Sequence, residues 1–172
     1  MSVEQASEKL RGILTRMNVP AEVVGREDEE RIILEIRGEE TALLIGKHGA
    51  TLDALQYLVQ RMMLGKGPPP PEGRVRGERG DGSKLIVVDA EGYRDRRSEA
   101  LIDLANRLAG KAKKTRRPVA ASPMSPADRR IMHVALADVP GLTTHSEGEG
   151  PSRHLVVVPD PNFDFGPQDE SA

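Results

Sequence analysis

The residues best suited to chemistry lie in one short turn, Gly46-Lys47-His48-Gly49, where two basic side chains stand between two glycines. Glycine permits a positive φ and, because it has no Cβ, lets another backbone approach closely. The turn also lies at the start of a helix predicted over residues 51–64, where free N–H groups and the positive end of the helix dipole favour phosphate. These residues could therefore clamp a sugar–phosphate backbone. The alternative is an ordinary helix–turn–helix corner in which the glycines are only caps.

A run of cations lies at the end of a long helix predicted over residues 91–117. The run contains no acidic residue, and its basic members are Lys111, Lys113, Lys114, Arg116 and Arg117. Cations suit the C-terminal end of a helix, so part of the run is structural. Five cations in so short a stretch exceed that need, and we favour contact with phosphate.

A later helix is predicted over residues 125–138. Ser125 is a suitable N-cap, Pro126 suits the first helical position, and Asp128 falls in the first turn. A helical wheel predicts one apolar, buried side, formed by Ala127, Ile131, Val134 and Ala135.

The opposite side of that helix carries Arg129 and His133, four residues apart and therefore stacked on one face. We expect both, with the neighbouring Arg130, to face solvent as a cationic group that can bind an anion.

Charge is distributed unevenly along the 172 residues, although the formal net charge is only −2. Residues 91–133 carry 11 basic and 5 acidic side chains, and residues 45–90 carry 7 and 5. The flanking segments are acidic, with 6 basic and 10 acidic side chains in residues 1–44 and 1 and 7 in residues 134–172. A cationic middle indicates a face for a polyanion. The alternative is charge segregation without function.

Composition argues against several classes of protein. The chain has no Cys, which excludes disulfides and thiolate metal sites and agrees with a reducing cytoplasm. No signal peptide is visible, and no apolar run approaches the roughly 20 residues of a membrane span. Two Tyr, two Phe and no Trp give little support to base stacking on an aromatic platform. We predict no catalytic residue, no metal site and no cofactor.

Other segments must position these groups, and the predicted fold class is α+β. Up to residue 90 we predict a helix over 3–17, strands over 21–26 and 31–37, a short helix before the glycine turn, the helix over 51–64 and a strand over 84–90. Residues 65–83 contain four consecutive prolines and are rich in Gly and Arg, which predicts an exposed loop. Beyond the long helix we predict strands over 118–121, 143–146 and 154–158, and a disordered tail over 160–172.

Several motifs together resemble a known family. They are Leu44–Gly49 with Thr51–Leu58, Asp89–Arg94, Arg129–His133 and Ser146–Pro151. The combination is similar to the bacterial Jag family, also called the SpoIIIJ-associated or KhpB proteins, over roughly residues 3–159. These proteins pair a KH domain with a domain named for an Arg-x-x-x-His motif, here Arg129 and His133. The predicted element order to residue 90 is that of a type II KH domain, so we expect a KH domain over 1–90 and an Arg-x-x-x-His domain over 91–159.

The resemblance implies a cytoplasmic RNA-binding protein, a post-transcriptional regulator or RNA chaperone linked to cell elongation, division or envelope control. It also implies pairing with a small stand-alone KH protein similar to KhpA. The sequence departs from the family in three places. It begins directly at the KH helix without the separate N-terminal Jag domain of many members, it carries the long insertion over 65–83, and residues 125–128 differ from the usual pattern.

We therefore expect two adjoining surfaces, on a rigid pair of small domains, to contact single-stranded RNA or single-stranded DNA. Gly46–Gly49 would hold the backbone, with Lys47 and His48 near phosphate. Ile45 and Leu52 would line an apolar groove for splayed bases. The side chains of Arg129, Arg130 and His133, with the run over 111–117, would extend the track.

Two other functions compete with RNA binding. An enzyme such as a nuclease is poorly supported because no Asp/Glu/His cluster has metal-ligand spacing. His145 and His154 could meet across the last hairpin, but such a pair without a carboxylate or Cys is a weak metal site. The stronger alternative is a protein-interaction module that dimerises, with a second copy or another KH protein, and whose RNA groove is vestigial. It predicts no salt-sensitive RNA binding.

Overall fold

The computed structural model describes residues 2–64 and 84–166, and the chain divides into two compact units, residues 1–94 and 95–172. The loop predicted over 65–83 lies outside the described residues, as does the end of the predicted tail. Among the helices of the described ranges, none has the length and apolar composition that a bilayer-spanning segment requires.

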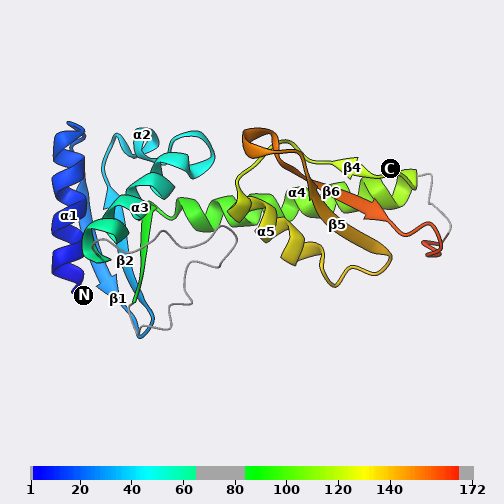
Figure 1. Ribbon diagram of the computed structural model, residues 1–172, viewed down its shortest axis with the longest axis horizontal. Helices are drawn as coiled ribbons and strands as arrows, with labels where there is room; N and C mark the ends of the chain where they lie inside the picture. The colour runs from blue at the N-terminus through cyan, green and yellow to red at the C-terminus, as the bar shows by residue number, and fades with distance from the viewer. Residues whose placement is uncertain (1, 65–83, 167–172) are drawn as a thin grey trace. The chain divides into compact units, whose positions relative to one another are not determined.

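The first unit is a three-stranded sheet with helices on one face (Figure 1). Its elements are α1 (Val3–Arg16), β1 (Glu22–Glu27), β2 (Arg31–Arg37), α2 (Thr41–Ile45), η1 (Lys47–Gly49), α3 (Ala50–Leu64) and β3 (Leu85–Ala90). The central strand, β2, is antiparallel to β1 and parallel to β3. A parallel pair needs a long crossover, and α2 and α3 lie in the segment that connects these two strands. The predicted order of helices and strands is confirmed.

Local sequence explains these elements. Ser2 caps α1 by accepting a hydrogen bond from the backbone N–H of Gln5 at 3.3 Å. In β2 the apolar residues Ile32, Leu34 and Ile36 are fully buried, and they alternate with partly or fully exposed neighbours. Helix α1 packs against β1 and β2, α3 packs against β3, and the two helices contact each other, so both cover the same face of the sheet.

The second unit is built on α4 (Tyr93–Thr115), whose first two residues belong to the first unit. Its other elements are β4 (Val119–Ala120), α5 (Pro126–Leu136), β5 (Leu142–Glu147), η2 (Gly150–Ser152) and β6 (His154–Pro159). The strands form an antiparallel sheet in the order β4-β6-β5. The core consists mainly of Leu101, Ala105, Ala109 and Ala112 of α4, Met132 and Leu136 of α5, and Leu142, Leu155 and Val157 of the sheet.

The buried side of α5 differs from the prediction. Asp128, Met132 and Leu136 are buried, whereas Ala127 is exposed and Val134 is 60% exposed. Ile131 and Ala135 are partly buried and pack against the core, as predicted. The buried side is therefore shifted relative to the apolar wheel, and the Asp128 carboxylate, paired with Arg97, takes one of its inward positions.

The expected disorder from residue 160 is wrong for residues 160–166. The backbone N–H of Asp160 donates to the carbonyl of Gly141 at 2.8 Å, and the rings of Phe163 and Phe165 lie 4.8 Å apart between centroids. Phe165 also packs against the core of the second unit. Two aromatic side chains therefore fold this segment onto the unit.

Candidate nucleic-acid interface

The backbone of the glycine turn has positive φ angles at Gly46 and Gly49, which glycine adopts more easily than other residues. Gly46 has φ +66° and ψ −169°, and a Cβ there would clash with Oγ1 of Thr51. Gly49 has φ +86°, and a Cβ there would lie 3.0 Å from Cε1 of Tyr93. His48, with φ 55°, is also in the left-handed region. The tight turn leaves Lys47 and His48 exposed, as a phosphate clamp requires.

The two apolar residues beside the turn differ in accessibility. Ile45 is half-buried and packs against the core, so part of its side chain is accessible. Leu52 is fully buried at 0% exposure. The prediction that Leu52 lines an open groove is wrong, because its place on α3 faces the sheet. It belongs to the core of the first unit instead.

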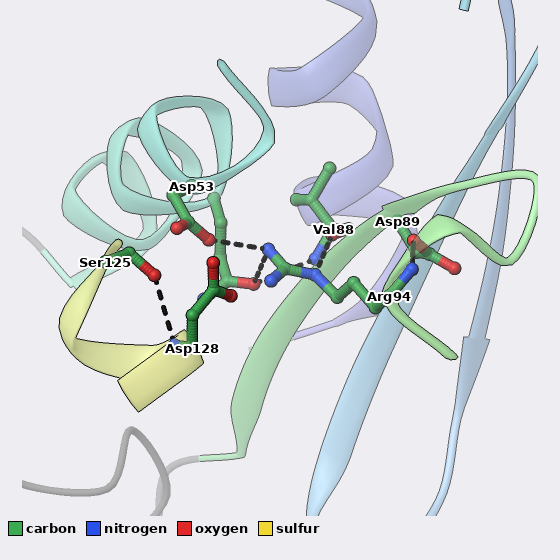
Figure 2. Close-up of polar contacts among 7 residues, drawn as sticks. Asp53, Val88, Asp89, Arg94, Ser125 and Asp128 are labelled. Carbon is green, nitrogen blue, oxygen red and sulfur yellow. Dashed lines mark hydrogen bonds and ion pairs between the residues drawn. The ribbon is translucent and has the colours of Figure 1, made fainter. Parts of the chain in front are cut away.

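Arg94 organises a set of polar contacts between α3, β3 and the start of α4 (Figure 2). Its Nη2 donates to Oδ1 of Asp53 at 3.0 Å and to Oε1 of Gln56 at 3.1 Å. Its Nε donates to the carbonyl of Val88 at 2.8 Å, and its backbone N–H donates to Oδ1 of Asp89 at 3.1 Å. These bonds tie α3 to β3 and to the start of α4.

This network also offsets the negative charge of Asp53 near the glycine turn. Asp53 lies in the first turn of α3, close in sequence to Lys47 and His48, where a bare carboxylate would repel phosphate. The guanidinium of Arg94 pairs with that carboxylate. Sequence reasoning quoted Arg94 only as part of a motif and missed this role, although its place after the buried strand was a usable indication.

In the second unit, the start of α5 is fixed by two contacts of Asp128. Its backbone N–H donates to Oγ of Ser125 at 3.1 Å, which confirms the predicted N-cap and is drawn in Figure 2. Its carboxylate, only 7% exposed, accepts from Nη2 of Arg97 at 2.8 Å. Nε of Arg97 is buried and has no hydrogen-bond partner among the described residues.

His133 is exposed on α5, as predicted, whereas Arg129 is only partly exposed, and each is held by a neighbour. Arg129 is half-buried, and its Nη1 donates to the carbonyl of Met124 at 3.3 Å. Burial lowers the pKa of Arg129, and the nearby charge of Arg153 lowers it further. Two guanidinium groups therefore lie close enough to repel each other.

His133 is exposed, and Nδ1 of its ring lies 2.5 Å from Oγ1 of Thr144 on β5. This hydrogen bond fixes the plane of the imidazole and leaves Nε2 to meet a ligand. Arg130 is also exposed. Arg130 and His133 are thus accessible on α5. Thr144 of β5 orients the His133 ring, a contact that the sequence did not indicate.

The cationic run at the end of α4 is not uniform. Lys111, Lys114 and Arg117 are exposed, and Lys113 is half-buried. The guanidinium carbon of Arg116 lies 4.5 Å from the centroid of the Phe165 ring, and Nη1 of Arg116 donates to the carbonyl of Phe163 at 3.0 Å. These two contacts hold the exposed Arg116 against the segment after β6, while its predicted contact with phosphate stays a prediction.

The described residues contain no group of three or more His, Cys, Asp or Glu side chains that could hold a metal ion. The two histidines of the last hairpin have other contacts. Nε2 of His145 lies 2.7 Å from a carboxylate oxygen of Glu147, and Nδ1 of His154 lies 3.1 Å from the carbonyl of Ser152.

Comparisons with known proteins agree with this division of the chain. A family model described as the KH domain of KhpA/KhpB matches residues 4–67. A second model, that of the R-three-H domain named for the Arg-x-x-x-His motif, matches residues 99–159. Neither description is that of an enzyme. The fold and the matches define the class: a KH domain followed by an R-three-H domain.

Individual relatives narrow the class to one family. The RNA-binding protein KhpB of Clostridium symbiosum is 36% identical over 156 residues, which cover 90% of this chain and 64% of that protein. The RNA-binding protein KhpB of Bacillus subtilis is 35% identical over 157 residues, covering 90% of this chain and 69% of that protein. The chain belongs to the KhpB/Jag family, and it spans about two thirds of the length of these relatives.

Proposed function

We propose that this chain binds single-stranded RNA through two cationic sites, one in each unit. The first unit acts as a type II KH domain whose Gly46–Gly49 turn clamps the sugar–phosphate backbone. The observation that carries the proposal is the pair of exposed basic side chains, Lys47 and His48, in a glycine-defined turn beside a carboxylate already engaged by Arg94. The relatives named as RNA-binding proteins support the same function.

The two kinds of contact have different tasks. Lys47, His48, Arg129 and His133 meet phosphate, which supplies affinity without sequence preference. The accessible part of Ile45 meets a splayed base beside the turn. Arg130, Lys111, Lys113, Lys114 and Arg117 add weaker, longer-range attraction. Two modest sites on one chain gain affinity by effective concentration, whatever the geometry that relates them, provided one strand can reach both.

The central experiment replaces both turn cations, Lys47→Asp with His48→Asp. Binding of a fluorescein-labelled oligouridylate is followed by fluorescence anisotropy between about 50 and 200 mM salt. We expect most of the affinity to be lost and the salt dependence to become shallower, by about one counterion for each phosphate contact removed. Far-UV circular dichroism should be unchanged because both side chains are exposed.

A matched control places the same kind of charge reversal elsewhere on the first unit. Lys9 and Arg16 are exposed on α1, so Lys9→Glu with Arg16→Glu alters net charge without touching the turn. The control should bind with a small, salt-screened loss. Equal binding by the turn variant and the wild type would disprove the role of the turn.

A second candidate function, pairing with another KH protein, is favoured by exposed apolar residues on the first unit. Leu43 of α2 is 66% exposed, and Leu58 and Met62, neighbours one turn apart on α3, are 45% and 51% exposed. The matching family model covers both KhpA and KhpB domains. We propose that these side chains receive a small KhpA-like KH protein or a second copy of this chain. Leu58→Glu with Met62→Glu should abolish complex formation in size-exclusion chromatography with light scattering while oligouridylate binding persists.

We further propose a cytoplasmic role in post-transcriptional regulation or as an RNA chaperone, linked to cell elongation, division or envelope control. Family membership supports this proposal. Crosslinking the protein to RNA in cells and sequencing the bound fragments would test it. Bound transcripts unrelated to those processes, with levels unaffected by loss of the gene, would count against it.

A further inference from the structure

One arginine outside every predicted site lies close to Arg129. Arg153 is exposed and follows η2, directly before β6. Its carbonyl accepts a hydrogen bond from the backbone N–H of Met124 at 3.2 Å. The carbonyl of the same Met124 accepts from Nη1 of Arg129 at 3.3 Å. The peptide groups of one residue therefore link the backbone of Arg153 to the guanidinium of Arg129.

The two arginines carry like charges that nothing described neutralises. Burial lowers the pKa of Arg129, and the charge of Arg153 lowers it further, in keeping with the backbone link between the two residues. Among the residues that the structure describes, no carboxylate lies within ion-pair distance of either one. Asp128, the immediate neighbour of Arg129, is turned inward to Arg97 at 2.8 Å.

Like charges held together by the fold favour an anion that contacts both. A guanidinium presents several N–H donors in a plane, matching the oxygens of a phosphodiester, and hydrogen bonds between charged groups are about twice as strong as neutral ones. Two arginines side by side can bind the two non-bridging oxygens of one phosphate, and the anion would remove their mutual repulsion.

We infer that Arg129 and Arg153 form a two-guanidinium site for a single phosphodiester of the RNA strand, with His133 one turn along α5 available to the adjoining nucleotide. The inference rests on the proposed function and names an additional binding residue for it. Arg153 escapes sequence reasoning because it is the single basic residue among seven acidic ones in residues 134–172. The net charge of that segment gives no sign of a cationic site, and Arg153 lies near Arg129 in the fold because β6 packs against α5.

The test compares Arg153→Gln with Arg107→Gln, a control at an exposed position of α4. Oligouridylate affinity of the full chain is measured by anisotropy at several salt concentrations. We expect Arg153→Gln to weaken binding about tenfold and to reduce the salt slope by about one. The control should stay within about twofold. Arg153→Lys should fall between the two, because it keeps the charge and loses the planar fork.

Arg129→Gln and the double variant Arg129→Gln with Arg153→Gln complete a double-mutant cycle of binding affinities. Because both arginines would hold one phosphate, the combined loss should be smaller than the product of the single losses. An NMR titration gives a second readout: the Nε–H signal of Arg153 should shift on adding oligouridylate, and only weakly with inorganic phosphate at the same concentration. Since the hydrogen bonds of Arg153 to Met124 and Gly150 use its backbone carbonyl and N–H, Arg153→Gln should keep the melting temperature of the wild type.

The outcomes separate the two proposals. If the wild type shows no salt-sensitive binding, the proposed function fails and the phosphate site fails with it. If the wild type binds but Arg153→Gln matches Arg107→Gln, the RNA function stands and the role of Arg153 is disproved.

Discussion

Removing the Asp128 carboxylate should destabilise the second unit far more than removing an exposed acidic residue. Asp128 and Arg97 lie 2.8 Å apart between Oδ2 and Nη2, with side chains 7% and 24% exposed. Asp128→Ala would leave a largely buried guanidinium without its carboxylate. Nε of that guanidinium already lacks a partner among the described residues, so the variant would leave still more buried N–H groups unsatisfied.

The expected magnitude follows from burial. Breaking a buried ion pair by removing one partner costs about 3–5 kcal/mol, and the partial exposure of Arg97 places this pair at the lower end. A first-turn carboxylate also interacts favourably with the helix dipole, by about 0.3–1 kcal/mol. We therefore expect Asp128→Ala to lower the free energy of unfolding by about 3 kcal/mol. Replacing both partners with apolar residues, Arg97→Met with Asp128→Leu, should recover most of that loss.

An exposed pair in the same unit provides the control. His145 and Glu147 approach to 2.7 Å, but their side chains are 51% and 56% exposed. Solvent screens such a pair, and Glu147→Ala should cost at most about 0.5 kcal/mol. The two substitutions thus remove carboxylates at nearly equal distances from their partners, and burial is the main difference between them.

The assay must report on the second unit alone, because a chain with two units need not unfold in one transition. Urea unfolding followed through the NMR amide signals of Leu155 and Val157, both in the core of that unit, satisfies this need. The chain has no Trp, so intrinsic fluorescence is a poor alternative. A loss below about 0.5 kcal/mol for Asp128→Ala, equal to that of Glu147→Ala, would refute the reasoning from burial.

Three further predictions concern backbone and charge. Gly46→Ala should destabilise the first unit by more than about 1 kcal/mol and weaken RNA binding, because of the positive φ and the clash with Thr51, as thermal melts and anisotropy would show. Gly110→Ala should instead raise the melting temperature, since an added Cβ in this helical position meets nothing within 4 Å, and helix propensity favours Ala by about 0.5–1 kcal/mol. Hydrogen bonds from the backbone N–H groups of Glu30 and Arg31 lower the pKa of Asp28. Its stabilising contribution is therefore present above the unfolded pKa and lost as pH falls through the folded value, and Asp28→Asn should flatten acid unfolding curves below about pH 4.

The regular elements were predictable where local patterns and burial agree. The strand over 31–37 was predicted with its observed bounds, because apolar and polar residues alternate between clear breaks. Ser125 and Pro126 also mark the start of α5 correctly. In these two elements the local sequence alone determines where the strand or helix begins or ends, and the tertiary contacts agree with it.

The inner face of α5 shows where such patterns fail. The apolar wheel places Val134 on the buried side, which is wrong because Val134 is 60% exposed, and it leaves out Asp128, which is buried. The polar residue is inside because Arg97, far away in sequence, neutralises it there. A partner at such a separation is invisible to any local pattern, and the same reason explains why Arg153 was missed beside Arg129.

In both units an arginine pairs with the acidic residue that would otherwise repel phosphate near the proposed binding site. Each proposed phosphate site lies near the first turn of a helix, where a carboxylate stabilises the helix but repels the ligand. In the first unit Arg94 pairs with Asp53 at 3.0 Å, and in the second Arg97 pairs with Asp128 at 2.8 Å. Each arginine lets the acidic residue keep its place in the helix while the cations beside it remain free for phosphate. Net charge along the sequence therefore understates both sites, since one acidic residue near each of them is already paired within the fold.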